Sequence, residues 1–229
     1  MAFWAQCRDA SFLAPMILRP LPESLNASPD WCDCVSPYGY STPLVAPTQE
    51  QLPAFLEAFV GLAQERNVVA AFFRLHPFWE LNKGDLCRFG KMVHHGQTIY
   101  LDLSVTQDEF WKQVRRNHKQ NYQRLVQDGF EVSIDDWAHL AAFTAIYRDT
   151  MQRVGAASCL YSEQYFIDLK SILGSSMHLC CVHSRTGAVV AGGVFVEMGG
   201  LVHYHLSATA NDCLRFGPNK LLIPAMRAW

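Results

Sequence analysis

The chain has 229 residues and a formal net charge of −2 at pH 7, with 50% hydrophobic and 17% charged residues. This composition supplies enough apolar material for a packed core and excludes an intrinsically disordered chain, while the charge argues against a protein that coats nucleic acids generally. The length fits one large domain or two small ones. The sequence has neither a cationic start followed by an apolar signal segment nor an uncharged apolar run of 18 residues. We therefore expect a cytoplasmic protein without a transmembrane segment.

The eight cysteines include no C-x-x-C pair and no Cys/His spacing of the zinc type, so we expect no metal site. Cys180 and Cys181 lie in the apolar run HLCCV, where free cysteine behaves as a small buried hydrophobic residue. This use of cysteine is typical of a reduced, cytosolic chain.

The first third of the chain changes character after residue 47. Residues 1–47 are rich in proline and turn residues, which indicates irregular strands and loops. Apolar residues then recur at helical spacing and predict a helix over 49–66 that ends at Asn67.

Strand signals follow this helix. The apolar run from Val68 to Phe73 predicts a buried strand. A turn near Asn82 to Gly84 then leads to two further expected strands, over 87–94 and 98–103.

A capping box marks the next helix. Thr106 and Glu109 form a T-x-x-E pattern, which predicts a helix that runs to Gln127 and is closed by Gly129. No acidic residue interrupts positions 110–127, and one helix face carries four basic residues, Lys112, Arg115, Arg116 and Lys119. This basic face is either the solvated side of a packed helix or a surface for the phosphates of a nucleotide, a coenzyme or an RNA end.

The remaining elements predict an α+β fold around a largely antiparallel sheet. A strand over 130–134 and a helix over 136–154 precede a third helix, which Ser162 caps and which extends to about Leu173. Three strands then follow in succession, with Gly199 and Gly200 forming a tight hairpin between the last two. These strands are expected over Met177–His183, Val189–Met198 and Leu201–Ala208.

The last forty residues contain a strand, a Gly-Pro loop and a helix that begins at Pro218 or Asn219. The start of a helix presents free backbone N–H groups and a partial positive charge, which suit a pyrophosphate. Arg215 and Lys220 flank the loop and add positive charge. Strand–loop–helix units with a glycine are also common without any ligand, so this pattern alone leaves an ordinary connection as the alternative.

Several segments in a fixed order resemble the FemABX and BioF2-like group of GNAT acyltransferases. The most informative are YHLSAT with GPNKLLIPAMRAW, and the hairpin VVAGGVFVEMGG before them. Four upstream segments agree in order, namely SPYGYSTPLV, FFRLHPFW, VRRNHKQNYQRL, and YRDTMQRVGA with the following Tyr161. Together these matches extend over roughly residues 36–229.

The resemblance implies a GNAT-like (acyl-CoA N-acyltransferase) fold, a mixed, mostly antiparallel sheet flanked by helices. We expect a partial N-terminal GNAT-like half over 1–105 and a C-terminal GNAT-like domain over 106–229, truncated at its C-terminus because members of the group have further strands there.

The implied activity is the transfer of an acyl group from an acyl-CoA such as acetyl-CoA to an amine on an amino sugar or a cell-envelope or polysaccharide precursor. The alternatives are Fem-type transfer from aminoacyl-tRNA to a peptidoglycan precursor, and a non-catalytic GNAT-like binding module. No DNA partner is implied. The sequence does not identify the acyl group or the acceptor.

The resemblance also suggests roles for particular residues, each with a structural alternative. Strand alternation puts His203, His205 and Ser207 on one face and Tyr204 and Leu206 on the other. For the histidines the alternative is a core position bonded to backbone, and for Arg74 and His76 it is an ordinary turn at Pro77. For Arg153 and Tyr161 the alternative is a structural salt link, and for Glu197 it is an edge position that faces water. The expected catalytic residues are Tyr204, His205 and Glu197. The expected donor-binding residues are Ser207, Thr209, Arg215, Gly217, Asn219 and Lys220. The expected acceptor-binding residues are Tyr38, Tyr40, Arg74, His76, Arg153 and Tyr161.

Overall fold

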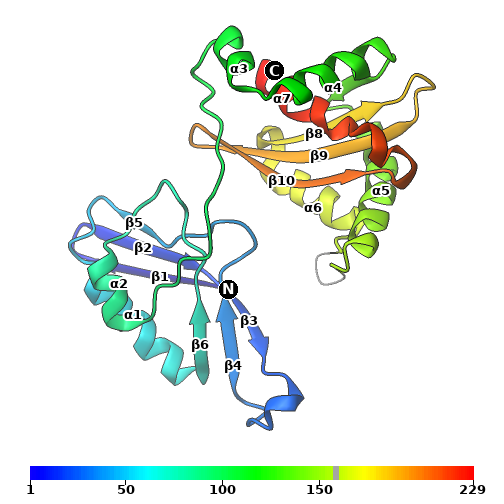
Figure 1. The fold of residues 1–229 in the computed structure, drawn as a ribbon. Helices are drawn as coiled ribbons and strands as arrows, with labels where there is room; N and C mark the ends of the chain where they lie inside the picture. The colour runs from blue at the N-terminus through cyan, green and yellow to red at the C-terminus, as the bar shows by residue number, and fades with distance from the viewer. Residues whose placement is uncertain (157–159) are drawn as a thin grey trace. The chain divides into compact units, whose positions relative to one another are not determined.

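The computed structural model describes residues 1–156 and 160–229, which form two compact units, Met1–Tyr100 and Leu101–Trp229 (Figure 1). The first unit has two small sheets around one hydrophobic core, and the second has a single sheet with a hydrophobic core on each face. That the first unit is a partial GNAT-like half stays a prediction. In the part of the chain that the structure describes, no helix combines the length and the apolar character needed to cross a bilayer.

The first unit contains two small sheets and two helices. In one sheet, β2 pairs antiparallel with both β1 and β5; in the other, β4 pairs antiparallel with β3 and parallel with β6. The strands are β1 (Ala2–Cys7), β2 (Ala10–Pro15), β3 (Ile17–Pro20), β4 (Cys32–Val35), β5 (Leu44–Ala46) and β6 (Val68–Phe72). The helices are the 3-10 turn η1 (Glu23–Leu25), α1 (Leu52–Glu65) and α2 (Lys83–Phe89).

Sequence predictions for this unit are confirmed in part. The helix expected over 49–66 is α1, whose apolar face packs against the rings of β1 and β2, and Asn67 follows it with a φ of 55°. The strand β6 exists, but the prediction that it is buried is wrong. Val69 is 50% exposed because β6 is the end strand of its three-stranded sheet.

The two strands expected over 87–94 and 98–103 are absent from the described structure, so this prediction is wrong. The side chain of Asn82 accepts hydrogen bonds from the backbone N–H groups of Gly84 and Asp85, at 2.9 and 3.3 Å, and so starts the helix α2 instead of a turn. Residues 91–104 have no strand partner and run as irregular chain.

The second unit is built on a four-stranded antiparallel sheet in the order β10-β9-β8-β7. Its strands are β7 (Glu131–Ile134), β8 (Met177–His183), β9 (Val189–Met198) and β10 (Leu201–Thr209). These four strands confirm the predictions from the sequence. The hairpin between β9 and β10 is closed by Gly199 and Gly200, whose φ angles of 57° and 78° are in the left-handed region that glycine adopts without strain.

Helices cover both faces of this sheet (Figure 1). One face, here called the α5/α6 face, packs Phe143, Tyr147 and Phe166 against the sheet. The other, the α4/α7 face, packs Leu125, Leu221 and Leu222. The helices of this unit are α3 (Gln107–Gln113), α4 (Arg116–Gln127), α5 (Leu140–Arg153), α6 (Glu163–Leu173) and α7 (Leu222–Ala228). Shorter 3-10 turns are η2 (Trp137–His139), η4 (Gly174–Ser176), η5 (Asn211–Phe216) and η6 (Pro218–Leu221).

The capping box is confirmed, because Thr106 Oγ1 accepts from Glu109 N at 3.3 Å and Glu109 Oε2 accepts from Thr106 N at 2.8 Å. The prediction of one helix up to Gln127 is wrong. Val114 and Arg115 are extended, with ψ angles of 130° and 144°, and separate α3 from α4. The break brings the ring of Trp111 against Tyr122, with ring centres 4.8 Å apart, a contact that one straight helix would not allow.

Cys180 and Cys181 are buried in β8, as predicted, with exposures of 0% and 1%. Burial is the main cause that raises the pKa of each thiol to about 12. Both therefore remain protonated and unreactive at neutral pH.

Candidate functional site

A β-bulge in β10 sets the geometry of the candidate site. Tyr204 pairs with Phe195 and Leu206 pairs with Val194, so His205 is the extra residue of the bulge. The simple alternation expected from the sequence is therefore wrong at this point. Tyr204 lies on the α4/α7 face with Phe195, whereas Leu206 belongs to the core of the α5/α6 face.

Tyr204 lies flat on Phe195, with ring centres 4.6 Å apart and 8° between the planes. The ring covers Gly193, where a side chain would collide with it. Burial raises the pKa of Tyr204, and a hydrogen bond with Ser207 opposes this shift. The phenol is therefore protonated at neutral pH and can donate a proton or a hydrogen bond.

His205 lies on the α5/α6 side of the bulge. Its Nε2 is 3.1 Å from Tyr165 Oη, and its ring is in edge contact with His203. Burial, followed by the charge of His203, lowers the pKa of His205 to about 4. The imidazole is consequently neutral at pH 7. Tyr161 stacks on Tyr165 with ring centres 4.1 Å apart, so the structure brings this expected acceptor-binding residue close to His205.

The end of β10 is fixed by α5. Thr150 Oγ1 donates to the carbonyl oxygen of Thr209 and accepts from its N–H, both at 3.3 Å. Arg153 donates to the same carbonyl at 3.5 Å and to the side chain of Asn211. Arg153 thus ties the helix to the strand end through hydrogen bonds to neutral groups, which differs from the salt link considered from the sequence. Its role in acceptor binding stays a prediction.

The loop after β10 holds the positively charged residues expected for a phosphate. The segment 210–218 is mostly the 3-10 turn η5, and the expected last helix begins as a second 3-10 turn, η6, before α7. Gly217 joins the two turns with a φ of 64°. The Nζ atom of Lys220 lies 3.5 Å from the position that a Cβ on Gly217 would take. Glycine at 217 therefore keeps open the space beside the Lys220 ammonium.

Neighbouring groups complete this loop. Asn121 of α4 donates to the carbonyl of Phe216 at 3.1 Å, while its own Oδ1 is buried without a hydrogen-bond partner among the described residues. Arg215 lies over the ring of Phe216 at 4.6 Å. Asn219 is exposed. Arg215, Gly217, Asn219 and Lys220 therefore lie together at one end of β10, as their sequence proximity requires.

Glu197 lies near the end of β9 with 51% of its side chain exposed. Its Oε2 is 3.9 Å from Nε2 of His178, and Nδ1 of His178 is 2.9 Å from Oδ2 of Asp135. Sequence reasoning missed both His178 and Asp135. The three residues are separated by 43 and by 19 positions, and only the register of the sheet brings them together.

The other expected acceptor-binding residues belong to the first unit. Tyr40 Oη is 3.1 Å from Thr98 Oγ1, and the ring of Tyr40 meets His76 edge-on at 5.7 Å. His76 stacks on Trp79, with ring centres 4.6 Å apart, and burial lowers its pKa. Tyr38 and Arg74 are exposed. The structure brings Tyr40 and His76 together with Trp79, a residue that sequence reasoning did not single out.

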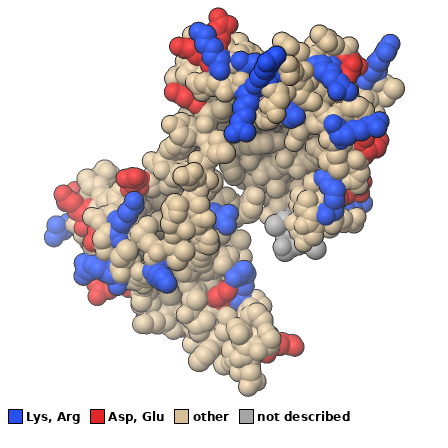
Figure 2. Space-filling model, viewed as in Figure 1, with Lys and Arg blue, Asp and Glu red and all other residues tan. Residues whose placement is uncertain are grey.

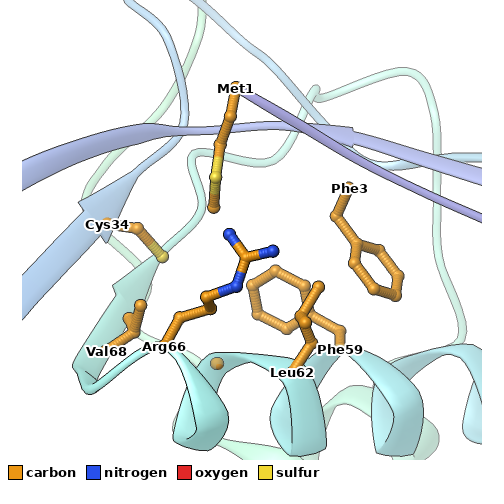
Figure 3. Close-up of a pocket in the computed structure, with 8 residues that line it drawn as sticks. Met1, Phe3, Cys34, Phe59, Leu62, Arg66 and Val68 are labelled. Atoms are coloured by element: carbon orange, nitrogen blue, oxygen red, sulfur yellow. The ribbon is translucent and has the colours of Figure 1, made fainter.

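Two hollows in the described part of the chain do not add a site. Apolar side chains and Arg66 surround a gap of about 10 Å³ in the first unit (Figure 3), which is room for one water molecule at most. An open depression of about 390 Å³ on the second unit is lined by residues of η2, α5 and α6, including Trp137 and Lys170. Among residues 1–156 and 160–229, no group of three or more His, Cys, Asp or Glu side chains is arranged to hold a metal ion.

Comparison with known protein families shows which family this chain belongs to. Residues 112–229, just over half of the chain, match the family described as Acetyltransferase (GNAT) domain. The chain belongs to the GNAT acetyltransferase family. It is accordingly an acyltransferase, as expected from the sequence. The match covers β10, its bulge and the loop at Gly217, which are the features assembled above.

Solved structures share the fold of this GNAT protein. The chain aligns over 100% of its length with a structure described as FemX, covering 76% of that chain at a TM-score of 0.67 and 14% identity. Two further structures each have a TM-score of 0.63 and are covered to 66%. They are L-PGS from Bacillus licheniformis, at 12% identity, and the C-terminal domain (DUF2156) of a putative lysylphosphatidylglycerol synthetase from Agrobacterium fabrum, at 13% identity. No curated protein sequence matched the chain. The expected α+β, FemABX-like GNAT fold is thus confirmed.

Proposed function

We propose that this GNAT protein transfers an acyl group from an acyl-CoA, with acetyl-CoA as the simplest donor, to an amine on an amino sugar or another cell-envelope or polysaccharide precursor. The observation that carries the proposal is the bulged edge strand β10, with Tyr204 and the neutral His205 at its centre and the Lys220 loop at its end. The free thiols among the described cysteines fit a reaction in the cytoplasm.

Donor binding follows from the position of β10 at the end of the sheet. In the described residues β10 pairs only with β9, so its outer edge is free to bond an extended chain that carries amides. At the end of the strand, Arg215 and Lys220 supply positive charge for the phosphates of the donor. We assign the adjacent polar groups of Ser207, Thr209 and Asn219, together with the backbone at Gly217, to the same task.

The chemical step needs no protein nucleophile. The amine nitrogen attacks the thioester carbonyl, the new C–N bond forms and the C–S bond breaks. Glu197 accepts the proton that the amine loses, and the protonated phenol of Tyr204 supplies a proton to the departing thiolate. The products are an amide and a free thiol, and the cycle closes when Glu197 loses its proton to water and the Tyr204 phenolate takes one up from water. His205, neutral at pH 7, serves as a hydrogen-bonding group that positions the donor at the bulge.

For the acceptor we propose the aromatic and basic residues named from the sequence. Tyr161 lies near His205, and Arg153 lies at the end of β10. Tyr38, Tyr40, Arg74 and His76 are proposed as an acceptor-binding group within the first unit by itself. Aromatic ring faces beside polar groups suit a sugar ring, which is apolar on its faces and polar at its rim.

The second candidate is aminoacyl transfer from tRNA. Two observations favour it, the fold shared with structures described as FemX and L-PGS, and the basic residues of α3 and α4. Figure 2 shows Lys and Arg side chains gathered over this region of the second unit. Arg115 and Arg116 are exposed at the start of α4 and are free to contact phosphates.

Thermal unfolding with different donors tests these proposals. We expect acetyl-CoA and free CoA to raise the unfolding temperature, and Lys220→Ala to reduce that rise. Lys91→Ala, which removes an exposed charge in the first unit, is the matched control and should respond like the parent protein. Stabilisation by aminoacyl-tRNA alone would favour the second candidate. No response to any donor would reject both and leave a non-catalytic binding module.

A further inference from the structure

Three acid–base groups from different strands meet at one end of the sheet in the second unit. Asp135 follows β7, His178 is near the start of β8, and Glu197 is near the end of β9. The imidazole of His178 lies between the two carboxylates, 2.9 Å from Asp135 and 3.9 Å from Glu197. The order of the groups is therefore carboxylate, imidazole, carboxylate.

Asp135 is held rigidly and fixes the proton on the imidazole. Its N–H donates to the carbonyl of Leu179 at 2.8 Å, and its Oδ1 accepts from the N–H of Leu179 at 3.3 Å. Its φ of 61° is a conformation that non-glycine residues adopt at a cost, which is often found at functional positions. Because Nδ1–H of His178 donates a hydrogen bond to Oδ2 of the Asp135 carboxylate, the neutral imidazole has its lone pair on Nε2.

This lone pair faces Glu197. The side chain of His178 is 5% exposed, and within the described chain its Nε2 is buried and has no hydrogen-bond partner. The indole of Trp229 covers the imidazole ring, with centres 4.2 Å apart. Among the described residues, the carboxylates that lie against His178 are Asp135 and Glu197, and Trp229, which follows α7, has no titratable side chain. A buried acceptor of this kind is poised to receive a proton from the Glu197 side.

Of the three residues Asp135, His178 and Glu197, Glu197 is the one that a substrate can reach. Half of its side chain is exposed, and it lies on the α4/α7 face with Phe195 and Tyr204. Glu197 pairs with Val202, which precedes Tyr204 by two residues, or about 7 Å along the strand. A substrate amine placed near Tyr204 is thus within reach of the Glu197 carboxylate, while His178 stays beneath it.

We infer that Asp135 and His178 are positioning residues for Glu197 and form with it a proton relay for the acceptor amine. This inference rests on the proposed function and adds the groups behind its base. The proton lost by the amine moves to the Glu197 carboxylate and then to Nε2 of His178, and Asp135 stabilises the imidazolium that forms. After product release the proton returns through Glu197 to water. The 3.9 Å separation shortens when Glu197 carries the proton, as happens for catalytic hydrogen bonds that are long in the resting enzyme.

The first test needs no activity. In ¹⁵N spectra of the full chain at alkaline pH, Nδ1 of His178 should be the protonated ring nitrogen and Nε2 the unprotonated one. Glu197→Gln should change the ¹⁵N shift of Nε2, and Asp135→Asn should change the ratio of the two tautomers. A protonated Nε2, or ring spectra that are the same in both variants as in the parent, would overturn the relay.

The second test is kinetic and uses acetyl-CoA with glucosamine as the probe amine. Glu197→Gln should lower kcat by roughly 100-fold, within the range of general acid–base catalysis, with little change in KM for acetyl-CoA. Asp135→Asn should lower kcat less and displace the ascending limb of the pH–rate profile. Glu131→Gln on β7, which also removes a carboxylate, is the control and should match the parent enzyme.

The outcomes separate the two proposals. If the parent enzyme acetylates glucosamine and Asp135→Asn lowers only the unfolding temperature while the pH–rate profile stays the same, the relay is rejected and the proposed function stands. If the parent enzyme neither binds acetyl-CoA nor acetylates an amine, the proposed function fails, and the spectra still decide whether the three groups share a proton.

Discussion

Gly193→Ala tests whether the position of Tyr204 matters for transfer. A Cβ at this site would lie 2.7 Å from Cε2 of Tyr204 and 3.2 Å from Cε2 of Phe195. The tyrosine ring therefore has to move by roughly 0.7 Å to restore an ordinary contact. Tyr204 is 37% exposed, so it has room to move, and the stability cost should be near the low end for overpacking, about 1 kcal/mol.

The expected effect is larger on catalysis than on stability. Replacing glycine by alanine lowers the conformational entropy of the unfolded chain and so stabilises the folded protein by about 0.5 kcal/mol, which offsets part of the overpacking cost. The unfolding temperature should then change by no more than about 4 °C. A misplacement approaching 1 Å lowers rates by up to about 100-fold, so we expect amide formation to fall between about 10- and 100-fold.

Gly192→Ala provides the matched control on the opposite face of the same strand. Its Cβ would lie 2.6 Å from Phe143, which is fully buried, and 3.3 Å from the backbone carbonyl of Cys180. Neither neighbour has room to move, so the cost should be about 3 kcal/mol, with a rate per folded molecule close to the parent value. The assay is thermal unfolding combined with acetyl transfer at a temperature where both variants are folded. A parental rate for Gly193→Ala, or an equal loss for both variants, would refute the reasoning.

Two further predictions follow from local chemistry. The pKa of His205 is about 4 in the folded protein, against an ordinary value of 6.5. Between these two pH values the unfolded chain therefore binds more protons than the folded one. The free energy of unfolding should fall by about 1–2 kcal/mol as the pH drops from 6.5 to 4, a range that allows for the partial exposure of the imidazole. Denaturant unfolding at several pH values should show this dependence for the parent and for His94→Gln, and a dependence unchanged in His205→Gln would contradict the assignment. Thr106→Ala removes the capping box with Glu109, so the free energy of unfolding should fall by about 1 kcal/mol and the unfolding temperature by about 2–4 °C. Thr106→Ser should keep most of the stabilisation by the cap, because serine also has a hydroxyl group. Equal unfolding temperatures for these two variants would show that the cap contributes nothing.

Much of the second unit was predictable from sequence because its signals are local. The Gly199-Gly200 turn fixes a two-residue hairpin, and Ser162 caps α6 through the N–H of Tyr165 at 3.3 Å. Thr106 and Glu109 likewise set the start of α3. Each of these features depends on residues within a few positions of one another, so a short stretch of sequence is enough to predict it.

Local signals failed where tertiary contacts compete with them. The helical pattern through Val114 continues in the sequence, yet the chain is extended there and Trp111 packs on Tyr122 instead. Asn82 caps the helix α2, although the sequence predicted a turn at this residue and a strand over 87–94. In β6, apolar residues predicted burial, but the position of the strand at the end of its sheet leaves Val69 half exposed.

The candidate site shows the same division. The sequence by itself determined the GNAT family resemblance, the β9–β10 hairpin and the charged loop with Lys220, since all of these are contiguous motifs. Only the tertiary structure decided that a bulge at His205 puts Leu206 on the face opposite to Tyr204, where simple alternation predicted one shared face. It also decided that Asp135 and His178 meet Glu197, because strand register, which long-range packing sets, brings distant residues into contact.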